Sequence, residues 1–173
     1  MPVVRASVDG FHSPAAVRLQ RGWQSAEGCY RDSFDYPALT RQLLAPFHDS
    51  AMEMVTSVFD YQTDRPRTHW ACVGSHAALL VDGVFLLRPE LCGHWTLRVY
   101  LHVPEHVTLT RALRRDRVSS GSERAVTQRY KRRYLPAQAT YRLEARPQDA
   151  AHIAIDNADP DSAKVLKWQV PDR

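Results

Sequence analysis

Four short, almost wholly apolar stretches, separated by longer segments with helical periodicity, constrain the fold of this chain most. They cover residues 3–8, 77–81, 97–103 and 152–155. Strands that are apolar on both sides are typical of parallel sheets that helices cover on both faces. Strands that alternate with helices indicate an α/β fold with a mostly parallel sheet. The sequence therefore predicts an α/β protein in which helices flank a parallel sheet.

The segments between these strands carry three helical patterns. Residues 36–44 follow Asp35, a residue type that caps helix N-termini, and place leucines on one side. Residues 106–117 place apolar side chains inward and arginines outward. Residues 122–142 predict a long helical segment that is broken or kinked at Pro136, because proline lacks the N–H that a helix interior needs.

Two acidic residues follow predicted strands, and a glycine follows each of them. Because α/β proteins bind ligands beyond the carboxyl ends of their strands, we expect Asp9 and Asp82 to face one crevice. Asp9 is a candidate general base, or it caps the next turn. Asp82 is a candidate Walker-B-like acid, or it belongs to a strand-end turn, since Asp-Gly is a common turn dipeptide. Residues 52–76 are less regular, and we expect from them a short β excursion that covers a substrate.

Length and composition favour one soluble domain over residues 1–173. The net charge of +4 is compatible with an anionic ligand, but no motif of a nucleic-acid-binding protein accompanies it. The three cysteines lack CxxC spacing and the histidines lack HxH or HExxH spacing, so no metal is predicted. No apolar run approaches the roughly 20 residues of a membrane span, and no signal pattern opens the chain. We expect a cytoplasmic protein with no membrane partner.

Six segments follow one another along the chain: VVRASVDGFH, CYRDSFDYPAL, VFDY, LLVDGVFLLRPEL, LRVYLHVPEHVTLTRALRRD and AAHIAIDN. Together and in this order they resemble the uridine kinase family, within the P-loop nucleoside and nucleotide kinases. The resemblance extends over residues 3–160 and implies a P-loop-kinase-like sheet.

The resemblance also implies roles for single residues. Asp9 matches the family's catalytic base, which takes the proton from the ribose 5′-hydroxyl, and His12 stands where many relatives have a tyrosine. We predict that these two residues are catalytic. The residues predicted to bind the substrate match the nucleoside-holding segment, the base pocket, the Walker-B-like acid and the RxxxRD pattern, or neighbour them: Tyr30, Arg31, Phe34, Asp35, Phe59, Asp60, Tyr61, Asp82, Arg111 and Arg115.

Two departures from the family pattern concern the phosphoryl donor. None of the seven glycines belongs to a GxxxxGK[ST] loop, which supplies N–H groups, a lysine and a Mg²⁺ ligand in such kinases. Residues 119–122, SSGS, stand where many relatives carry an arginine-rich lid. Losing one such donor costs a catalytic site about 2.7–4 kcal/mol. We therefore expect a fold whose first strand and P-loop are missing, without ATP-dependent catalysis.

The function expected from these features is a repurposed enzyme that has lost ATP binding and keeps the acceptor pocket. Asp9 would act as acid or base in the cyclisation, isomerisation, elimination or hydrolysis of a small polar or nucleoside-like molecule, a reaction suited to specialised metabolism. No cofactor is predicted. Two alternatives remain open: a nucleoside (uridine) kinase that uses Mg-ATP and whose P-loop segment is absent from this chain, and a non-catalytic pseudokinase that binds a ligand.

The missing strand also predicts an oligomer. In P-loop kinases the first strand lies in the middle of the sheet, so its loss leaves two rows of unpaired backbone groups. A second copy of the chain would fill this gap by pairing near residues 3–8 or 97–103. We expect a homodimer that binds a small-molecule substrate.

Overall fold

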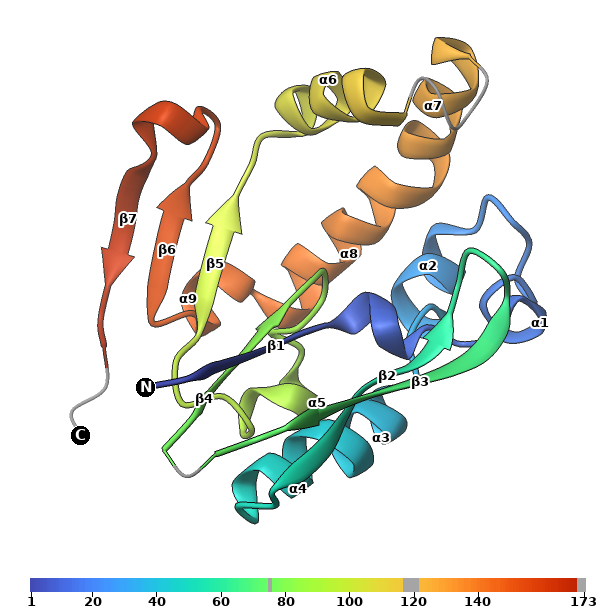
Figure 1. Ribbon diagram of the computed structural model, residues 1–173. Helices are drawn as coiled ribbons and strands as arrows, with labels where there is room; N and C mark the ends of the chain where they lie inside the picture. The colour runs from blue at the N-terminus through green and yellow to red at the C-terminus, as the bar shows by residue number, and fades with distance from the viewer. Residues whose placement is uncertain (75, 117–121, 171–173) are drawn as a thin grey trace. The chain divides into compact units, whose positions relative to one another are not determined.

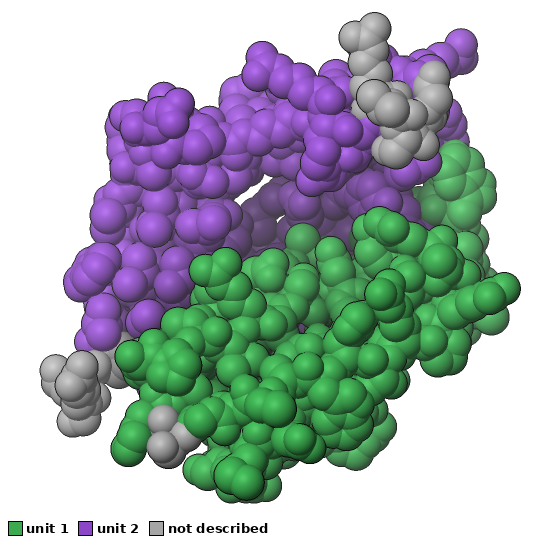
Figure 2. Space-filling view, in the orientation of Figure 1, with its two compact units in different colours: residues 1–86 green, residues 87–173 purple. Residues whose placement is uncertain are grey.

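The computed structural model describes residues 1–74, 76–116 and 122–170, and the chain folds into two compact units (Figure 2). The first unit comprises residues 1–86 and the second residues 87–173. Each has its own strands, helices and buried side chains. That residues 1–173 form a single domain stays a prediction. Within the described ranges, no helix has both the length and the hydrophobicity needed to cross a bilayer.

The first unit is built from short helices and two pairs of strands (Figure 1). Its elements are β1 (Val3–Ser7), the 3₁₀ helix η1 (Val8–Phe11), α1 (Ala15–Arg18), α2 (Ala26–Asp32), α3 (Tyr36–Leu39), the π-helical turn η2 (Thr40–Leu44), α4 (Ala45–His48), β2 (Glu53–Asp60), β3 (Arg65–Cys72) and β4 (Ala78–Asp82). β1 and β4 are parallel, and β2 and β3 form an antiparallel hairpin. The β excursion predicted for residues 52–76 is confirmed.

The second unit contains a three-stranded sheet in the order β5-β6-β7 (Figure 1). Its elements are α5 (Pro89–Cys92), β5 (Val99–His102), α6 (Glu105–Asp116), α7 (Glu123–Arg129), the π-helical turn η3 (Tyr130–Tyr134), α8 (Leu135–Ala145), α9 (Pro147–Ala150), β6 (Ile153–Asp156), the 3₁₀ helix η4 (Pro160–Ser162) and β7 (Lys164–Trp168). β5 and β6 are parallel, whereas β7 runs antiparallel to β6. The four strands predicted from apolar stretches are thus confirmed as two parallel pairs, with bounds shifted by one or two residues.

The predicted helices are present, with two π-helical turns that the sequence pattern did not indicate. Asp35 caps α3, since its carboxylate accepts a hydrogen bond of 2.8 Å from the Ala38 N–H. The irregularity predicted at Pro136 is the turn η3, which ends two residues before that proline. Likewise η2 ends two residues before Pro46. A proline ring clashes with the carbonyl four residues earlier in a regular helix, and a wider π turn relieves that clash.

The core of the first unit fixes the end of β1. η1 and η2 both pack against β2. The largest fully buried side chains here are Val8, Phe11, Tyr30, Leu39, Leu43, Leu44 and Met54. Val8 and Phe11 belong to η1, so burial holds the backbone on either side of Asp9 while the Asp9 side chain stays exposed. Burial of each such apolar side chain stabilises the fold by roughly 1.5–3 kcal/mol.

Candidate functional site

Asp9 and Asp82 lie at the same end of the β1–β4 pair, the edge at which both strands finish. The parallel register places Ser7 opposite Asp82, and Asp9 follows two residues later. The Ser7 hydroxyl accepts a hydrogen bond of 3.3 Å from the Asp9 N–H and donates one of 3.4 Å to the Asp82 carbonyl. Both acidic side chains are exposed. The expectation that these two strand ends meet is confirmed, because the strands are neighbours and parallel.

The glycine after each acid is required by the close packing of the backbone. A Cβ on Gly83, whose φ is 143°, would overlap the Val8 side chain. A Cβ on Gly10 would lie 2.9 Å from the Ser57 Cβ and 3.1 Å from its Cα. Such contacts are too short for any L side chain to be accommodated without a shift of Val8 or of Ser57. Glycine therefore lets the first unit hold both acids at a compact edge.

His12 joins the two acids at this edge, and its tautomer is fixed. Its Nδ1 lies 2.9 Å from the Asp9 carbonyl oxygen. Because a carbonyl only accepts, Nδ1 carries the proton and Nε2 keeps a lone pair. The ring stacks on Tyr61 (centroids 4.6 Å apart, planes at 29°) and meets Phe34 at 4.6 Å and 57°. Two aromatic residues thus hold the imidazole in one orientation.

The surroundings of His12 favour its neutral form. Burial lowers the pKa of the imidazole below its ordinary value. The hydrogen bond to the Asp9 carbonyl and the charge of the Asp9 carboxylate act in the opposite direction, and the nearby Arg18 guanidinium lowers the pKa further. At neutral pH the Nε2 atom is therefore a hydrogen-bond acceptor that stands beside an exposed carboxylate. This pair of acceptors suits proton transfer with a hydroxyl-bearing ligand.

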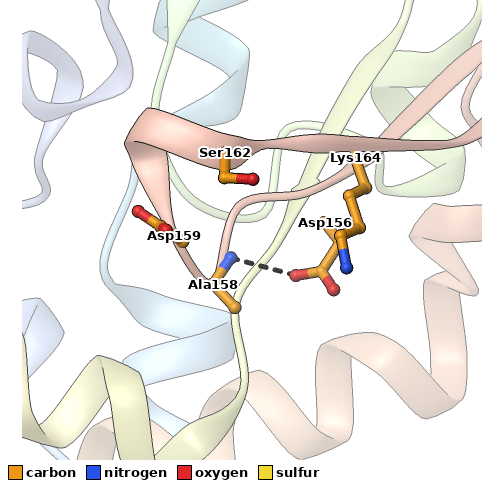
Figure 3. Close-up of a pocket in the computed structure, with 5 residues that line it drawn as sticks. All are labelled: Asp156, Ala158, Asp159, Ser162 and Lys164. Carbon is orange, nitrogen blue, oxygen red and sulfur yellow. Dashed lines mark hydrogen bonds between the residues drawn. The ribbon is translucent and has the colours of Figure 1, made fainter.

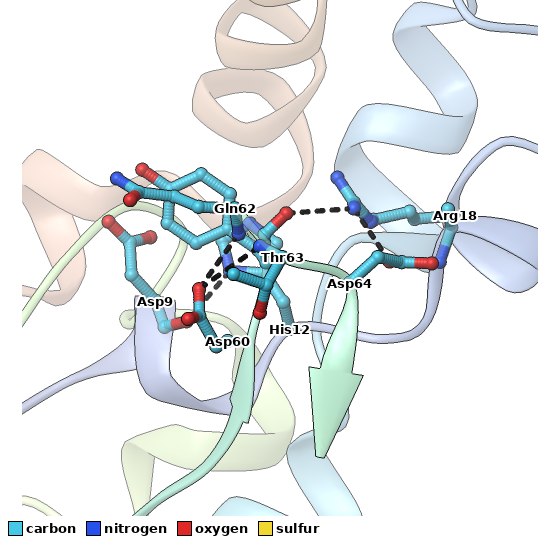
Figure 4. A network of polar contacts seen from close by, with 9 residues as sticks. Asp9, His12, Arg18, Asp60, Gln62, Thr63 and Asp64 are labelled. Atoms are coloured by element: carbon cyan, nitrogen blue, oxygen red, sulfur yellow. Dashed lines mark hydrogen bonds and ion pairs between the residues drawn. The ribbon is translucent and has the colours of Figure 1, made fainter. Parts of the chain in front are cut away.

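The turn of the β2–β3 hairpin lies against this group (Figure 4). The Asp60 carboxylate accepts hydrogen bonds from the N–H groups of Gln62 (2.9 Å) and Thr63 (3.4 Å) and lies 3.7 Å from Arg67. The Gln62 hydrogen bond contributes most to keeping the pKa of Asp60 below its ordinary value. Asp60, predicted to line a base pocket, thus stabilises the turn from which Tyr61 projects.

Two other predicted residues of the first unit, Phe34 and Asp35, contact the segment that carries Asp9 and His12. Phe34 forms an isolated β-bridge with His12, and the Asp35 N–H donates a hydrogen bond of 2.8 Å to the Phe11 carbonyl. The Asp35 carboxylate caps α3. Arg31 lies over the Tyr30 ring at 5.5 Å and pairs with Glu27. Buried side chains in this set are Tyr30, Phe34 and Phe59, whereas Tyr61 is 41% exposed. Their roles toward a ligand stay predictions.

Arg111 and Arg115 belong to the second unit, and both bind groups of the protein itself. Arg111 donates hydrogen bonds to the carbonyls of Asn157 (2.8 Å) and Ala158 (3.0 Å), which follow β6. Arg115 makes a forked contact with Asp116, at 2.6 and 3.1 Å, and reaches the Tyr130 hydroxyl at 2.9 Å. The Arg115 guanidinium is the main cause that lowers the pKa of Asp116, and the same contact raises that of Arg115.

The segment predicted to replace an arginine-rich lid lies mostly outside the described residues. Residues 119–121 are not among them. Ser122, the last residue of that segment, caps α7 by accepting a hydrogen bond of 3.2 Å from the Ala125 N–H.

Sequence reasoning missed two features of the structure. One is the contact of Arg18 with Asp64, at 2.9 Å. The other is a polar hollow of about 170 Å³ between β6 and β7, lined by Asp156, Ala158, Asp159, Ser162 and Lys164 (Figure 3). In it the Asp156 carboxylate accepts a hydrogen bond of 2.9 Å from the Ala158 N–H. The Asp156-Asn157 pair after an apolar stretch was a local signal for the hollow, whereas the Arg18–Asp64 contact had none.

Comparison with known proteins identifies the fold through structure rather than sequence. No family model matches the sequence, and no curated protein matches it significantly. A possible uridine kinase from Bacillus stearothermophilus is 20% identical, with a TM-score of 0.68 over 89% of this chain and 72% of that one. A putative fructose transport system kinase from Silicibacter sp. TM1040 is 20% identical, with a TM-score of 0.63 over 87% and 71% of the two chains. Phosphoribulokinase from Rhodobacter spheroides is 15% identical, with a TM-score of 0.61 over 98% and 66%.

These similarities show that the chain has the fold of the P-loop kinases, uridine kinase among them. The α/β fold expected from the alternating strands and helices is thereby confirmed.

Proposed function

We propose that the protein is an ATP-independent enzyme in which Asp9 acts as acid or base on a small polar or nucleoside-like molecule. The reaction is a cyclisation, isomerisation, elimination or hydrolysis. The observation that carries the proposal is the pairing, at one strand end, of the exposed Asp9 carboxylate with a neutral His12 that is held in one tautomer.

The chemistry follows from the two acceptors at this edge. Asp9 removes a proton from the ligand and returns it at a later step, as a general base and then a general acid. Nε2 of His12 accepts a hydrogen bond from a second hydroxyl or N–H group of the same ligand. The exposed Asp82 carboxylate adds negative charge next to Asp9. The edge therefore favours a ligand rich in hydroxyl or N–H donors over an anion.

Two arginines support chemistry without phosphoryl transfer. The guanidinium groups of Arg111 and Arg115 bind carbonyl, carboxylate and hydroxyl groups of the protein. Phosphoryl transfer depends on N–H donors and cations that are positioned around the phosphates. Proton transfer at Asp9 needs none of them.

The test compares the wild-type protein with Asp9→Asn and with the control Asp49→Asn, which changes an exposed carboxylate after α4. Ribonucleosides, deoxyribonucleosides and free pentoses are screened for binding by calorimetry and for conversion by proton NMR, without and with Mg-ATP. We expect conversion without ATP in the wild type and in D49N. In D9N we expect a loss of about 10²–10⁴-fold, the usual contribution of a positioned acid or base.

Each other outcome of this screen contradicts a stated part of the proposal. Unchanged conversion in D9N would remove Asp9 from the mechanism. A phosphorylated nucleoside that forms only with Mg-ATP would replace the proposal with a nucleoside kinase. Binding without conversion under every condition would favour a ligand-binding pseudokinase.

A further inference from the structure

The turn of the β2–β3 hairpin is tied to α1 through one arginine and one aspartate (Figure 4). Nη2 of Arg18 donates hydrogen bonds to Oδ1 of Asp64 at 2.9 Å and to the Tyr61 carbonyl at 3.3 Å. The same Oδ1 atom accepts a hydrogen bond of 2.9 Å from the Ala15 N–H. Both ends of α1 thus contact a turn more than 40 residues away, as the separations of 46 and 49 residues show.

These contacts fix the residue that covers His12. Arg18 binds the backbone carbonyl of Tyr61, and the Tyr61 ring stacks on His12 with centroids 4.6 Å apart. Asp60 binds the next two N–H groups, so the turn moves as one piece. β2 packs against η1 and η2, but residues 61–70, which form the turn and much of β3, are all exposed. The turn therefore depends on its contact with α1 to keep its position.

We propose that Arg18 and Asp64 form a latch that holds Tyr61 over His12, which makes them positioning residues of the site. The inference rests on the proposed function only in assigning Nε2 of His12 to ligand binding. With the latch closed, the imidazole is shielded from water and kept in one orientation. With the latch broken, the turn moves away and His12 becomes hydrated.

A plain surface ion pair predicts the opposite effect on His12. The charged groups that act on the imidazole are Asp9, which raises its pKa, and Arg18, which lowers it, while burial is the largest influence and lowers it. Asp64→Asn removes the charge that offsets Arg18. If the turn stayed in place, the pKa of His12 would therefore fall. If the latch opens, burial is relieved and the pKa rises toward that of a solvated histidine, about 6.5.

The sign of this shift is the test. The ring protons of His12 are titrated by NMR in wild type, D64N and the control Asp32→Asn, which breaks the Arg21–Asp32 pair of 2.8 Å in the same unit. We expect D64N to raise the pKa of His12 and to weaken the nuclear Overhauser contacts between His12 and Tyr61, with no change in D32N. A fall or no change in D64N, with the contacts intact, overturns the latch.

A second variant keeps the proposal testable if D64N does not fold. Arg18→Lys keeps the positive charge but ends one bond short of Nη2, the single atom that donates to both Asp64 and the Tyr61 carbonyl. Because the charge is retained, a raised pKa of His12 in R18K, together with weaker nuclear Overhauser contacts to Tyr61, indicates exposure. An unchanged or lowered pKa with these contacts intact overturns the proposal. Affinity for a bound nucleoside should weaken by about fivefold or less in either variant, the usual range for a partly exposed ion pair.

The pKa of His12 and its nuclear Overhauser contacts with Tyr61 are measured without ligand and without turnover. Failure of the latch therefore leaves the comparison of D9N with wild type as an independent test of the proposed function. Conversely, unchanged conversion in D9N would refute the proposed role of Asp9, while the pKa shift of His12 in D64N would still test the latch.

Discussion

Replacing Gly83 with alanine should destabilise the strand end that carries both acids. Gly83 follows Asp82 with a φ of 143°, and a Cβ there would overlap Cγ1 of Val8 and lie 3.0 Å from its Cβ. Val8 is fully buried and directly precedes Asp9. Since Val8 has no space into which it can retreat, the substitution must shift either β4 or the backbone next to Asp9.

The magnitude follows from two costs. An alanine at this positive φ costs about 1–3 kcal/mol in backbone strain. Overpacking against a buried valine costs about 1–3 kcal/mol more. A total of about 3 kcal/mol, in the lower half of the combined range, corresponds to a fall in melting temperature of about 6–12 °C for a chain of this size.

The assay is urea unfolding followed by circular dichroism, with hydrogen exchange by mass spectrometry on peptides from β1 and β4. The matched control is Gly74→Ala in the same unit, where a Cβ meets no atom within 4 Å. That variant should be neutral or more stable by up to about 1 kcal/mol, because alanine restricts the unfolded chain. Equal stability of G83A and G74A would show that the close approach of β4 to Val8 does not exist.

Three further predictions follow from single contacts. Because burial lowers the pKa of His12, the imidazole binds a proton more readily in the unfolded chain than in the folded one. The free energy of unfolding should therefore fall as the pH drops below about 6.5. It should fall less steeply in His12→Asn, as urea titrations at pH 5.5 and 7.5 would show. Asp35→Ala should cost about 1 kcal/mol in thermal melts by removing the cap on Ala38, whereas Asp35→Asn should retain most of it. Among the described strands β5 pairs only with β6, and its Val99 and Leu101 are 45% and 53% exposed. Light scattering should therefore show a homodimer, which Leu101→Lys should dissociate. A monomeric wild type would refute the pairing.

The elements with strong local signals could be predicted from the sequence. Four apolar stretches predicted the strands that form the two parallel pairs. Asp35, which precedes regularly spaced leucines, predicted the cap of α3. β7 was missed because KVLKW mixes charged and apolar residues at an edge strand, where only one side pairs. α2 was missed because its seven residues include a glycine and only a short apolar pattern.

The position of the candidate site in the fold could be predicted from the sequence. The hydrogen-bond partners of its side chains could not. The strand-end pattern placed Asp9 and Asp82 at one edge, because the ends of neighbouring parallel strands coincide. The bonds of Asp60 to its own turn and of Arg111 to the carbonyls after β6 depend on side-chain directions that a motif does not encode. The same holds for the Arg18–Asp64 pair, whose members are 46 residues apart.

The two sides of the site are held by different forces, and this decides how each responds to substitution. The edge under Asp9 and Asp82 is fixed by close packing at Gly10 and Gly83, where an added Cβ would meet Ser57 of β2 and Val8 of η1, respectively. Changes there act on folding. The turn that carries Tyr61 is held by side-chain hydrogen bonds on an exposed surface, which contribute little to global stability. Changes there act on the position of the ring over His12. Variation in the turn can therefore alter what the site binds while the acids stay in place.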